Sequence, residues 1–239
     1  MGGMNGTEQT GRPLHRTFRG HWLFLVLLLG TFAAVFSRYW IDLPVAEWCW
    51  TRHYGIGDAK YPKGILDFLV VAEAFGNWLG MVVATVLIIE LDGSWRWRLF
   101  RYFTSIFWAG LIVNLIKIFV VRLRPQGFRF RTPDLVLQQN VISIDWTPWA
   151  SAFKGLQHSF PSGHTATAFA ACVVLSFFYP KGKRVFLLLA VLVGIQRIVV
   201  CAHFPSDVIV GAMIGLFVGS ACTSFSPLAR FCDRLESPK

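Results

Sequence analysis

The chain has 239 residues, of which 54% are hydrophobic and only 15% are charged, a composition too apolar for an ordinary soluble domain. Its net charge of +10 would suit a nucleic-acid-binding protein, but most Lys and Arg residues stand at the ends of apolar runs, as in membrane proteins. We therefore expect a membrane protein that does not bind nucleic acid.

Six runs of mainly apolar residues approach the roughly 20 residues that a helix needs to cross the hydrocarbon core of a membrane. They predict an all-α fold, a polytopic six-helix transmembrane bundle that forms one domain over residues 21–226. The polar segments 1–20 and 227–239 are predicted to be cytoplasmic tails, the first of them disordered.

The first apolar run, residues 22–36, follows three arginines and could be the core of a signal peptide. No small-residue cleavage site follows it, which favours a retained helix. Residues 42–73 then mix charged side chains with Trp and Tyr, and they predict an amphipathic segment that lies in the headgroup region without crossing.

The other five runs give the remaining predicted spans. The basic residues gather in the two tails and in two short turns, which an even number of spans places on one side, the cytoplasm. The first of these turns is predicted to carry Arg96, Arg98 and Arg101. The predicted spans are 75–89, 102–121, a helix that begins at Pro161, 185–202 and 205–222.

The longest polar connection, residues 126–157, is more typical of a functional loop than of a linker. Its Arg129, Arg131 and Lys154 either contact an anionic headgroup or belong to a solvated loop. His158, which follows it, is either a further ligand or a loop residue without a role.

The sequence Phe160-Pro161-Ser162-Gly163-His164 stands directly before the fourth apolar run. Proline is favoured at the first helical position, so we expect Pro161 to open a helix whose first turn carries the next three residues. The spare backbone N–H groups of such a turn and the helix dipole favour an anion, and Gly163 lets it approach the backbone. This stretch predicts a phosphate site.

More polar residues are expected at the same face of the membrane, where the third and fifth spans end and the fourth and sixth begin. Lys117 and Arg124 are two helical turns apart and share a helix face, and Arg197 stands near the end of the fifth span. Pro205 is expected to start the sixth helix, which leaves His203 just outside and puts Asp207 in the first turn, within reach of the imidazole.

Each of these residues alone has an ordinary explanation, because Lys and Arg snorkel and an Asp often caps a helix. Three cations, two histidines and a carboxylate at one membrane level are costly unless a site uses them. Two His and an Asp could also hold zinc, but the adjacent cations would repel a metal ion. No disulfide framework or zinc site follows from the unpaired spacing of Cys49, Cys172, Cys201, Cys222 and Cys232.

In their order and spacing, three motifs resemble those of the type 2 phosphatidic acid phosphatase superfamily, which shares its active site with the vanadium haloperoxidases. The motifs are Lys117 with six residues before Arg124-Pro125, then the Pro161-Ser162-Gly163-His164 stretch, then Arg197 with five residues before His203 and three more before Asp207. The resemblance covers the part from Lys117 to Asp207. One departure is Gln196, where the family commonly has Ser.

This resemblance implies a six-helix membrane enzyme that hydrolyses lipid phosphates without a metal ion or other cofactor. His203 would be the nucleophile that forms a phosphohistidine, and Asp207 would fix its tautomer and stabilise the imidazolium. His164 would protonate the departing lipid alkoxide and then activate water. The groups that would bind the phosphoryl oxygens are Lys117, Arg124, Ser162, the Gly163 N–H and Arg197.

The expected function is therefore hydrolysis of a lipid phosphomonoester or diphosphate in a bacterial inner membrane, with the site at the periplasmic or outer face. Phosphatidate, phosphatidylglycerophosphate, an undecaprenyl diphosphate and a lipid A phosphate all stay open as substrates, and the sequence predicts no oligomeric state. Two other classes also stay open: a non-catalytic lipid-phosphate binding or transport protein of the same fold, and a vanadate-dependent oxidase.

Overall fold

The structure, a computed structural model, describes residues 16–54, 60–93, 95–127, 142–144, 158–225 and 230. The helices are α1 (Arg16–Trp40), α2 (Asp42–His53), α3 (Lys63–Glu73), α4 (Trp78–Leu91), α5 (Trp95–Phe119), α8 (Gly163–Phe178), α9 (Lys183–Val199) and α10 (Pro205–Ser220). Shorter helical turns are η1 (Ala74–Gly76), η2 (Pro125–Gly127), η3 (Pro180–Gly182) and η4 (Ala221–Phe225). Strands β1 (Val120–Val121) and β2 (Ser143–Ile144) pair antiparallel.

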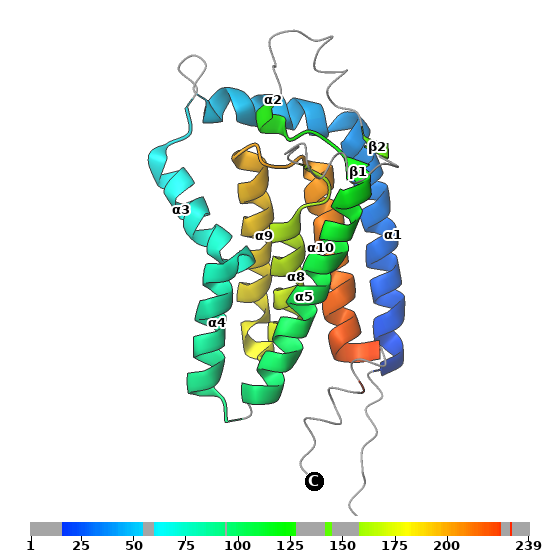
Figure 1. Cartoon of the computed structure of the whole chain (residues 1–239), viewed down its shortest axis with the longest axis vertical. Coiled ribbons are helices and arrows are strands. Elements are labelled where there is room, and N and C mark those ends of the chain that lie inside the picture. Colours follow the sequence, from blue (N-terminus) through cyan, green and yellow to red (C-terminus); the bar gives the residue numbers. More distant parts are fainter. Residues whose placement is uncertain are drawn as a thin grey trace, which may run out of the picture.

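The bundle is built around α8, which packs against α5, α9 and α10. Figure 1 shows α1 beside α10 at one edge, the α3 and α4 pair at the other edge, and α2 lying across the upper end. The ends of α5 and α9 and the starts of α8 and α10 all meet at that upper end. This arrangement brings together the four helix ends that carry the predicted site residues.

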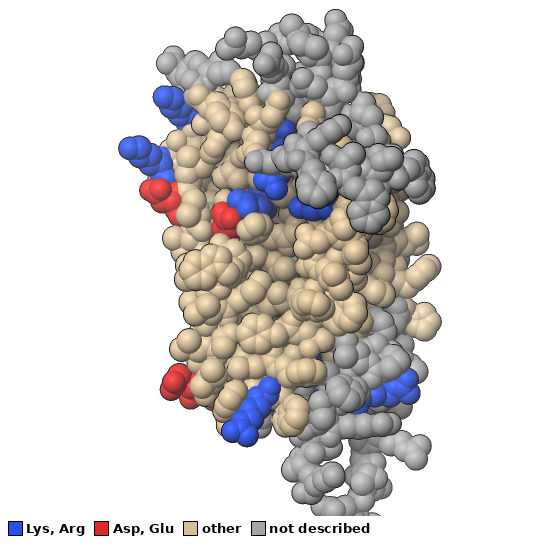
Figure 2. Space-filling model, viewed as in Figure 1, with Lys and Arg blue, Asp and Glu red and all other residues tan. Residues whose placement is uncertain are grey.

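The outer surface of the bundle is apolar. Three helices, His21–Trp40, Trp95–Phe119 and Pro205–Ser224, are long and apolar enough to cross a membrane, and the bent pair of α3 and α4 makes up to four. Large apolar side chains such as Phe24, Phe32 and Val86 are exposed. In Figure 2 the charged side chains of this face lie toward the two ends, with a broad band free of charge between them. The mainly helical fold and the membrane setting are both confirmed.

Several helix boundaries differ from the predicted ones. The helix α8 begins at Gly163, so Pro161 lies before it instead of opening it, and Ser162 is its N-cap. The helix α5 begins at Trp95, which places the basic cluster of Arg96, Arg98 and Arg101 in its first turns and not in a connecting turn. Pro205 begins α10, as predicted.

The N-terminal elements also depart from the predicted pattern. The helix α1 already begins at Arg16, inside the predicted tail 1–20, while α3 begins at Lys63, inside the segment 42–73 predicted to be amphipathic. Val70 and Val71 of α3 are exposed and apolar, and α3 meets α4 at an angle of 63°. The break falls at Asn77, whose side chain caps α4 by accepting a hydrogen bond from the Leu79 N–H at 2.9 Å.

Three predicted groups lie outside the described residues. They are most of the tail 1–20, most of the tail 227–239, and the loop residues Arg129, Arg131 and Lys154. Cys232 lies outside them too.

Close contact between the backbones of α8 and α10 sets the position of Asp207. Gly211 and Gly215, one turn apart on α10, face Ser162 and Ala166 so closely that a Cβ at either glycine would overlap a carbonyl oxygen of α8. Small residues at four-residue spacing are the usual means of bringing membrane helices together. The Ser162 N–H donates to the Asp207 carbonyl at 3.0 Å, so the start of α8 is fixed to the first turn of α10.

A buried ion-pair network joins α2, the segment after β1 and α10. Arg122 donates from Nη2 to Asp42 Oδ2 at 2.7 Å and from Nη1 to Ser206 Oγ at 2.9 Å, and both ionic side chains are fully buried. Asp42 also accepts hydrogen bonds from the Ser206 N–H and from the Ser37 hydroxyl, both at 2.9 Å. The guanidinium stacks on Phe204 at 3.9 Å from the ring centroid. Such networks are stabilising only when every partner is present.

We predict that Asp42→Ala lowers the free energy of unfolding by about 3–5 kcal/mol, because Arg122 loses one of its carboxylate partners and three other donors, the Ser37 hydroxyl and the N–H and hydroxyl of Ser206, lose their acceptor. Chemical denaturation of the purified protein in detergent measures this change. Asp67→Ala is the matched control, since Asp67 on α3 is exposed and its loss should change stability by less than about 0.5 kcal/mol. Equal effects of the two substitutions would contradict the prediction.

Candidate active site

The turn between α9 and α10 places His203. The helix α9 is terminated by Cys201, which has φ 56°, a left-handed conformation that costs a non-glycine residue about 1–2 kcal/mol. The His203 N–H donates back to the Arg197 carbonyl at 3.1 Å, and the Gln126 N–H donates to the Cys201 carbonyl at 2.9 Å. Main-chain hydrogen bonds on both sides therefore hold the turn that carries the imidazole.

The His203 imidazole lies beside Asp207 and Ser159. Its Nδ1 is 3.8 Å from Asp207 Oδ2, which is too long for a hydrogen bond, and 3.4 Å from Ser159 Oγ. The Ser159 hydroxyl donates to the same Asp207 oxygen at 2.5 Å. The link between imidazole and carboxylate that the sequence predicts as direct thus runs in part through Ser159.

The Asp207 carboxylate is fully buried and has partners on each side. It reaches back to accept the Phe204 N–H at 2.9 Å, as an acidic side chain in the first turn of a helix can do. Its other oxygen accepts a short hydrogen bond from Arg122 Nη1. Arg122 therefore connects the site to Asp42 and the buried network described above.

Burial dominates the electrostatics of His203. Loss of solvent lowers the pKa of this imidazole below its ordinary value, and the adjacent Asp207 carboxylate opposes that shift in part. The positive charges of Lys117 and Arg124 lower the pKa further. Near neutral pH the ring is therefore uncharged, with a lone pair on one nitrogen.

The predicted cations gather around the two histidines. Lys117 near the end of α5, Arg124 after β1 and Arg197 near the end of α9 all lie close enough to His164 for their charges to act on it, as does His203. The prediction that Lys117 and Arg124 share a helix face was wrong, because α5 ends at Phe119. Lys117 and Arg124 also act on His203. The structure thus brings together five groups from distant parts of the sequence into a positively charged cluster suited to an anion.

The start of α8 contributes His164 and backbone amides to this cluster. Gly163 is the first residue of the helix and His164 the second, and the His164 side chain is 38% exposed, so a ligand can reach it. Ser162 differs from its predicted role as a phosphate ligand, because it is fully buried and its hydroxyl pairs with that of Thr165 at 2.9 Å. The backbone amides at the start of the helix keep the geometry of an anion site.

A carboxylate that the motifs do not include also contacts this cluster. Glu73, at the end of α3, lies with Oε1 2.9 Å from Arg197 Nη1 and 3.5 Å from His164 Nε2. Gln196, the residue that departs from the family pattern, donates from its amide to Glu73 Oε2 at 2.7 Å and accepts from Arg197 Nε at 2.7 Å. The longer side chain of Gln196 thus bridges Glu73 and Arg197.

Four polar residues of this region were not predicted from the sequence. Asp42 and Glu73 belong to the segment that was predicted to be amphipathic. An acidic residue next to an apolar stretch is itself a signal of a functional or ion-paired group. Arg122 and Ser159 carried no comparable signal, because only the fold shows that they face Asp207.

His158 and the cysteines have no role in the site predicted from the sequence. His158 is half-buried, with Nδ1 3.3 Å from the Val120 carbonyl oxygen. Among the described residues Cys49, Cys172, Cys201 and Cys222 are free thiols, all of them buried.

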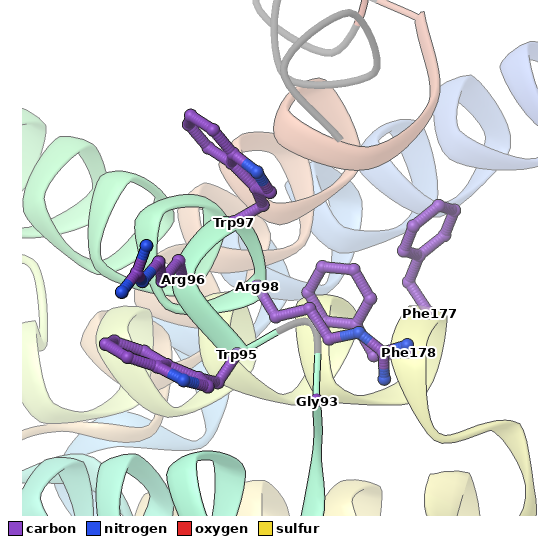
Figure 3. Close-up of a pocket in the computed structure, with 7 residues that line it drawn as sticks. All are labelled: Gly93, Trp95, Arg96, Trp97, Arg98, Phe177 and Phe178. Atoms are coloured by element: carbon purple, nitrogen blue, oxygen red, sulfur yellow. The ribbon is translucent and has the colours of Figure 1, made fainter. Parts of the chain in front are cut away.

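A pocket opens at the opposite end of the bundle. Figure 3 shows that Trp95, Arg96, Trp97 and Arg98 of α5 line it together with Phe177 and Phe178 of α8. Arg98 is ion-paired with Asp92 and lies over the Phe178 ring, 5.2 Å from its centroid. This pocket shares no residue with the histidine site.

Comparisons with known proteins agree with the geometry. The family model described as the PAP2 superfamily matches residues 98–230. The chain is 33% identical over 179 residues to a lipid A 1-phosphatase of Rhizobium etli, a match that covers 67% of this chain and 71% of the relative.

Two solved structures have a similar fold. Aquifex aeolicus LpxE matches with a TM-score of 0.54 and 22% identity, over 76% of this chain and 94% of its own. A PAP2-type phosphatidylglycerolphosphate phosphatase from Bacillus subtilis matches with a TM-score of 0.54 and 18% identity, over 92% and 98%. Family, relatives and site agree, and this chain belongs to the PAP2 superfamily as an integral membrane phosphatase of lipid phosphates.

Proposed function

We propose that the protein hydrolyses lipid phosphates through a phosphohistidine on His203, with Asp207 and His164 as the other catalytic residues and no metal ion. The observation that carries this proposal is the placement of a buried, uncharged imidazole between a carboxylate and a cluster of cations. A metal ion is not required, because the cations themselves stabilise the negative charge of the phosphoryl group.

In the first step the free nitrogen of His203 attacks phosphorus and forms the P–N bond. The P–O bond to the lipid breaks, its electron pair stays on the lipid oxygen, and His164 gives that oxygen a proton. The positive charge that develops on His203 is stabilised by Asp207, with Ser159 fixing the Nδ1 side of the ring. Lys117, Arg124, Arg197 and the Gly163 N–H bind the equatorial oxygens.

In the second step His164 removes a proton from water, which attacks the phosphohistidine. The P–N bond breaks, its electron pair returns to His203, and inorganic phosphate leaves. Buried Ser162 contributes through the position of the helix start and not through its hydroxyl, which bonds to Thr165.

An apolar groove beside Glu73 fits an acyl or prenyl chain. It has a volume of about 410 Å³ and runs between α3 and α4 on one side and α8 and α9 on the other. Its wall is almost wholly apolar, and its upper end includes Ala72 and Ala74, the neighbours of Glu73. A lipid whose phosphate lies among the cations therefore places its chain in this groove. A lipid A phosphate is the first substrate to test, because relatives carry the name lipid A 1-phosphatase.

The membrane topology that we propose has six crossings: α1, the bent α3 and α4 pair, α5, α8, α9 and α10. The connection through η3 and the start of α5 carry Lys and Arg at the end opposite the histidines. By the positive-inside rule that end faces the cytoplasm. The site then lies at the periplasmic face of a bacterial inner membrane, with both tails cytoplasmic.

His203→Ala should lower phosphate release from a lipid phosphate by about 10³-fold or more, because the nucleophile is lost. The assay uses the purified protein in detergent with a chelator, and a labelled phosphoryl group should form an acid-labile, alkali-stable adduct with the unaltered protein only. His158→Ala is the control and should keep most of the activity. Activity that depends on a divalent metal, or that survives in His203→Ala, would sink the proposal.

Ala84→Phe should raise KM for a long-chain lipid phosphate about tenfold, because a ring would fill the groove that the chain occupies. Hydrolysis of a soluble aryl phosphate should stay unchanged, which shows that the site is intact. Val82→Phe, on the same helix but outside the groove, is the matched control. Equal loss toward both substrates would argue against the groove as the chain's site.

Reporter fusions should separate the two faces of the membrane. Alkaline phosphatase fused after Tyr54 should be active and the same enzyme fused after Lys181 inactive, because the first junction is periplasmic and the second cytoplasmic. A fluorescent protein that matures only in the cytoplasm should fluoresce at the C-terminus. The reverse pattern would invert the proposed orientation.

A further inference from the structure

Glu73 is a carboxylate inside a cluster of side chains otherwise arranged for anions. Its side chain is 19% exposed and touches two groups of the site at once, Arg197 at 2.9 Å and His164 at 3.5 Å. The mechanism proposed above does not use Glu73. A carboxylate beside a bound phosphate needs an explanation, because two negative charges close together repel.

The fold holds Glu73 at this position. The break between α3 and α4 presses Gly76 against the first turn of α8, where a Cβ at Gly76 would lie 2.7 Å from the His164 carbonyl oxygen. Thr167 donates from its hydroxyl to the Gly76 carbonyl at 2.8 Å. The end of α3 is therefore fixed to the same turn that carries His164, and Gln196 holds the carboxylate from the side of α9.

The place of Glu73 relative to phosphorus follows from the proposed reaction. In an in-line displacement the attacking and leaving atoms stand on opposite sides of phosphorus. His203 occupies the attacking side and His164 the leaving side, and the contact of Glu73 is with His164. The carboxylate therefore borders the leaving group and not the nucleophile.

We propose that Glu73 is a specificity-determining residue, which favours lipids whose phosphate is esterified to an uncharged, hydroxyl-bearing group such as a sugar and disfavours lipid diphosphates. This inference rests on the proposed function. A sugar leaves as a neutral alcohol once His164 has given its proton to the departing oxygen, and its hydroxyl groups can donate hydrogen bonds to the carboxylate. A diphosphate leaves as a lipid monophosphate, whose second phosphoryl group keeps its negative charge beside Glu73.

Other charges face the leaving side as well. Arg197, Lys117 and Arg124 act on His164 and attract any phosphate, whichever group is leaving. They therefore contribute affinity without discriminating between the two substrate classes. Among the described acidic residues, Glu73 is the one paired with His164, so discrimination by charge depends on it.

The test compares kcat/KM for a glycolipid 1-phosphate and for a polyprenyl diphosphate of similar chain length, with the full-length protein in mixed micelles containing a chelator. The unaltered protein should prefer the glycolipid. Glu73→Gln, which keeps the shape and removes the charge, should lower the ratio of the two kcat/KM values about 10- to 100-fold, chiefly by improving diphosphate hydrolysis. Glu73→Asp keeps the charge and should keep the preference.

Glu90→Gln is the matched control, because Glu90 is an exposed carboxylate at the far end of α4, and its substitution should leave the ratio unchanged. A loss of both activities by the same factor in Glu73→Gln, or a preference of the unaltered protein for the diphosphate, would overturn this inference alone. Release of phosphate from neither substrate by the unaltered protein would overturn the proposed function and this inference with it.

Discussion

The buried chain of charges from Asp42 through Arg122 to Asp207 is the interaction on which the site depends. One guanidinium satisfies carboxylates from two helices and stacks on Phe204, so the start of α2, the segment after β1 and the start of α10 cannot move independently. The same chain fixes the orientation of Asp207, which with Ser159 supports His203. Stability and catalytic geometry are thus supplied by the same residues, as expected where removal of one partner would leave a charge buried.

The two histidines each face a carboxylate, but they differ in burial. His203 is buried and backed by a carboxylate that is itself fully enclosed, which suits a group that must carry a positive charge only after attack. His164 is more exposed and faces Glu73, a carboxylate with contacts to two other side chains. In the proposed mechanism one imidazole bonds to phosphorus in the intermediate, and the other exchanges protons with a departing lipid and with water. The break between α3 and α4 places Glu73 beside His164.

Much of the site could be predicted from the sequence, because its groups belong to short stretches with their own local signals. Pro205 begins α10 and places Asp207 in the first turn, as the sequence predicts. The predicted helix start at Pro161 was wrong by two positions, since local propensity does not show where α8 meets α10. Arg122 and Glu73 could not be assigned, because their partners lie 80 residues or more away in sequence and only the packed bundle brings them together.

The glycines of α10 have a further consequence. Where Gly211 and Gly215 meet α8, main chain touches main chain, so no flexible side chains separate these two helices. Helices embedded in bilayers of different thickness adjust by tilting. A pair in backbone contact tilts as one body, and the distance between the two imidazoles at its upper end stays constant. We therefore expect the enzyme to tolerate changes in lipid composition that would misalign a site built between loosely packed helices.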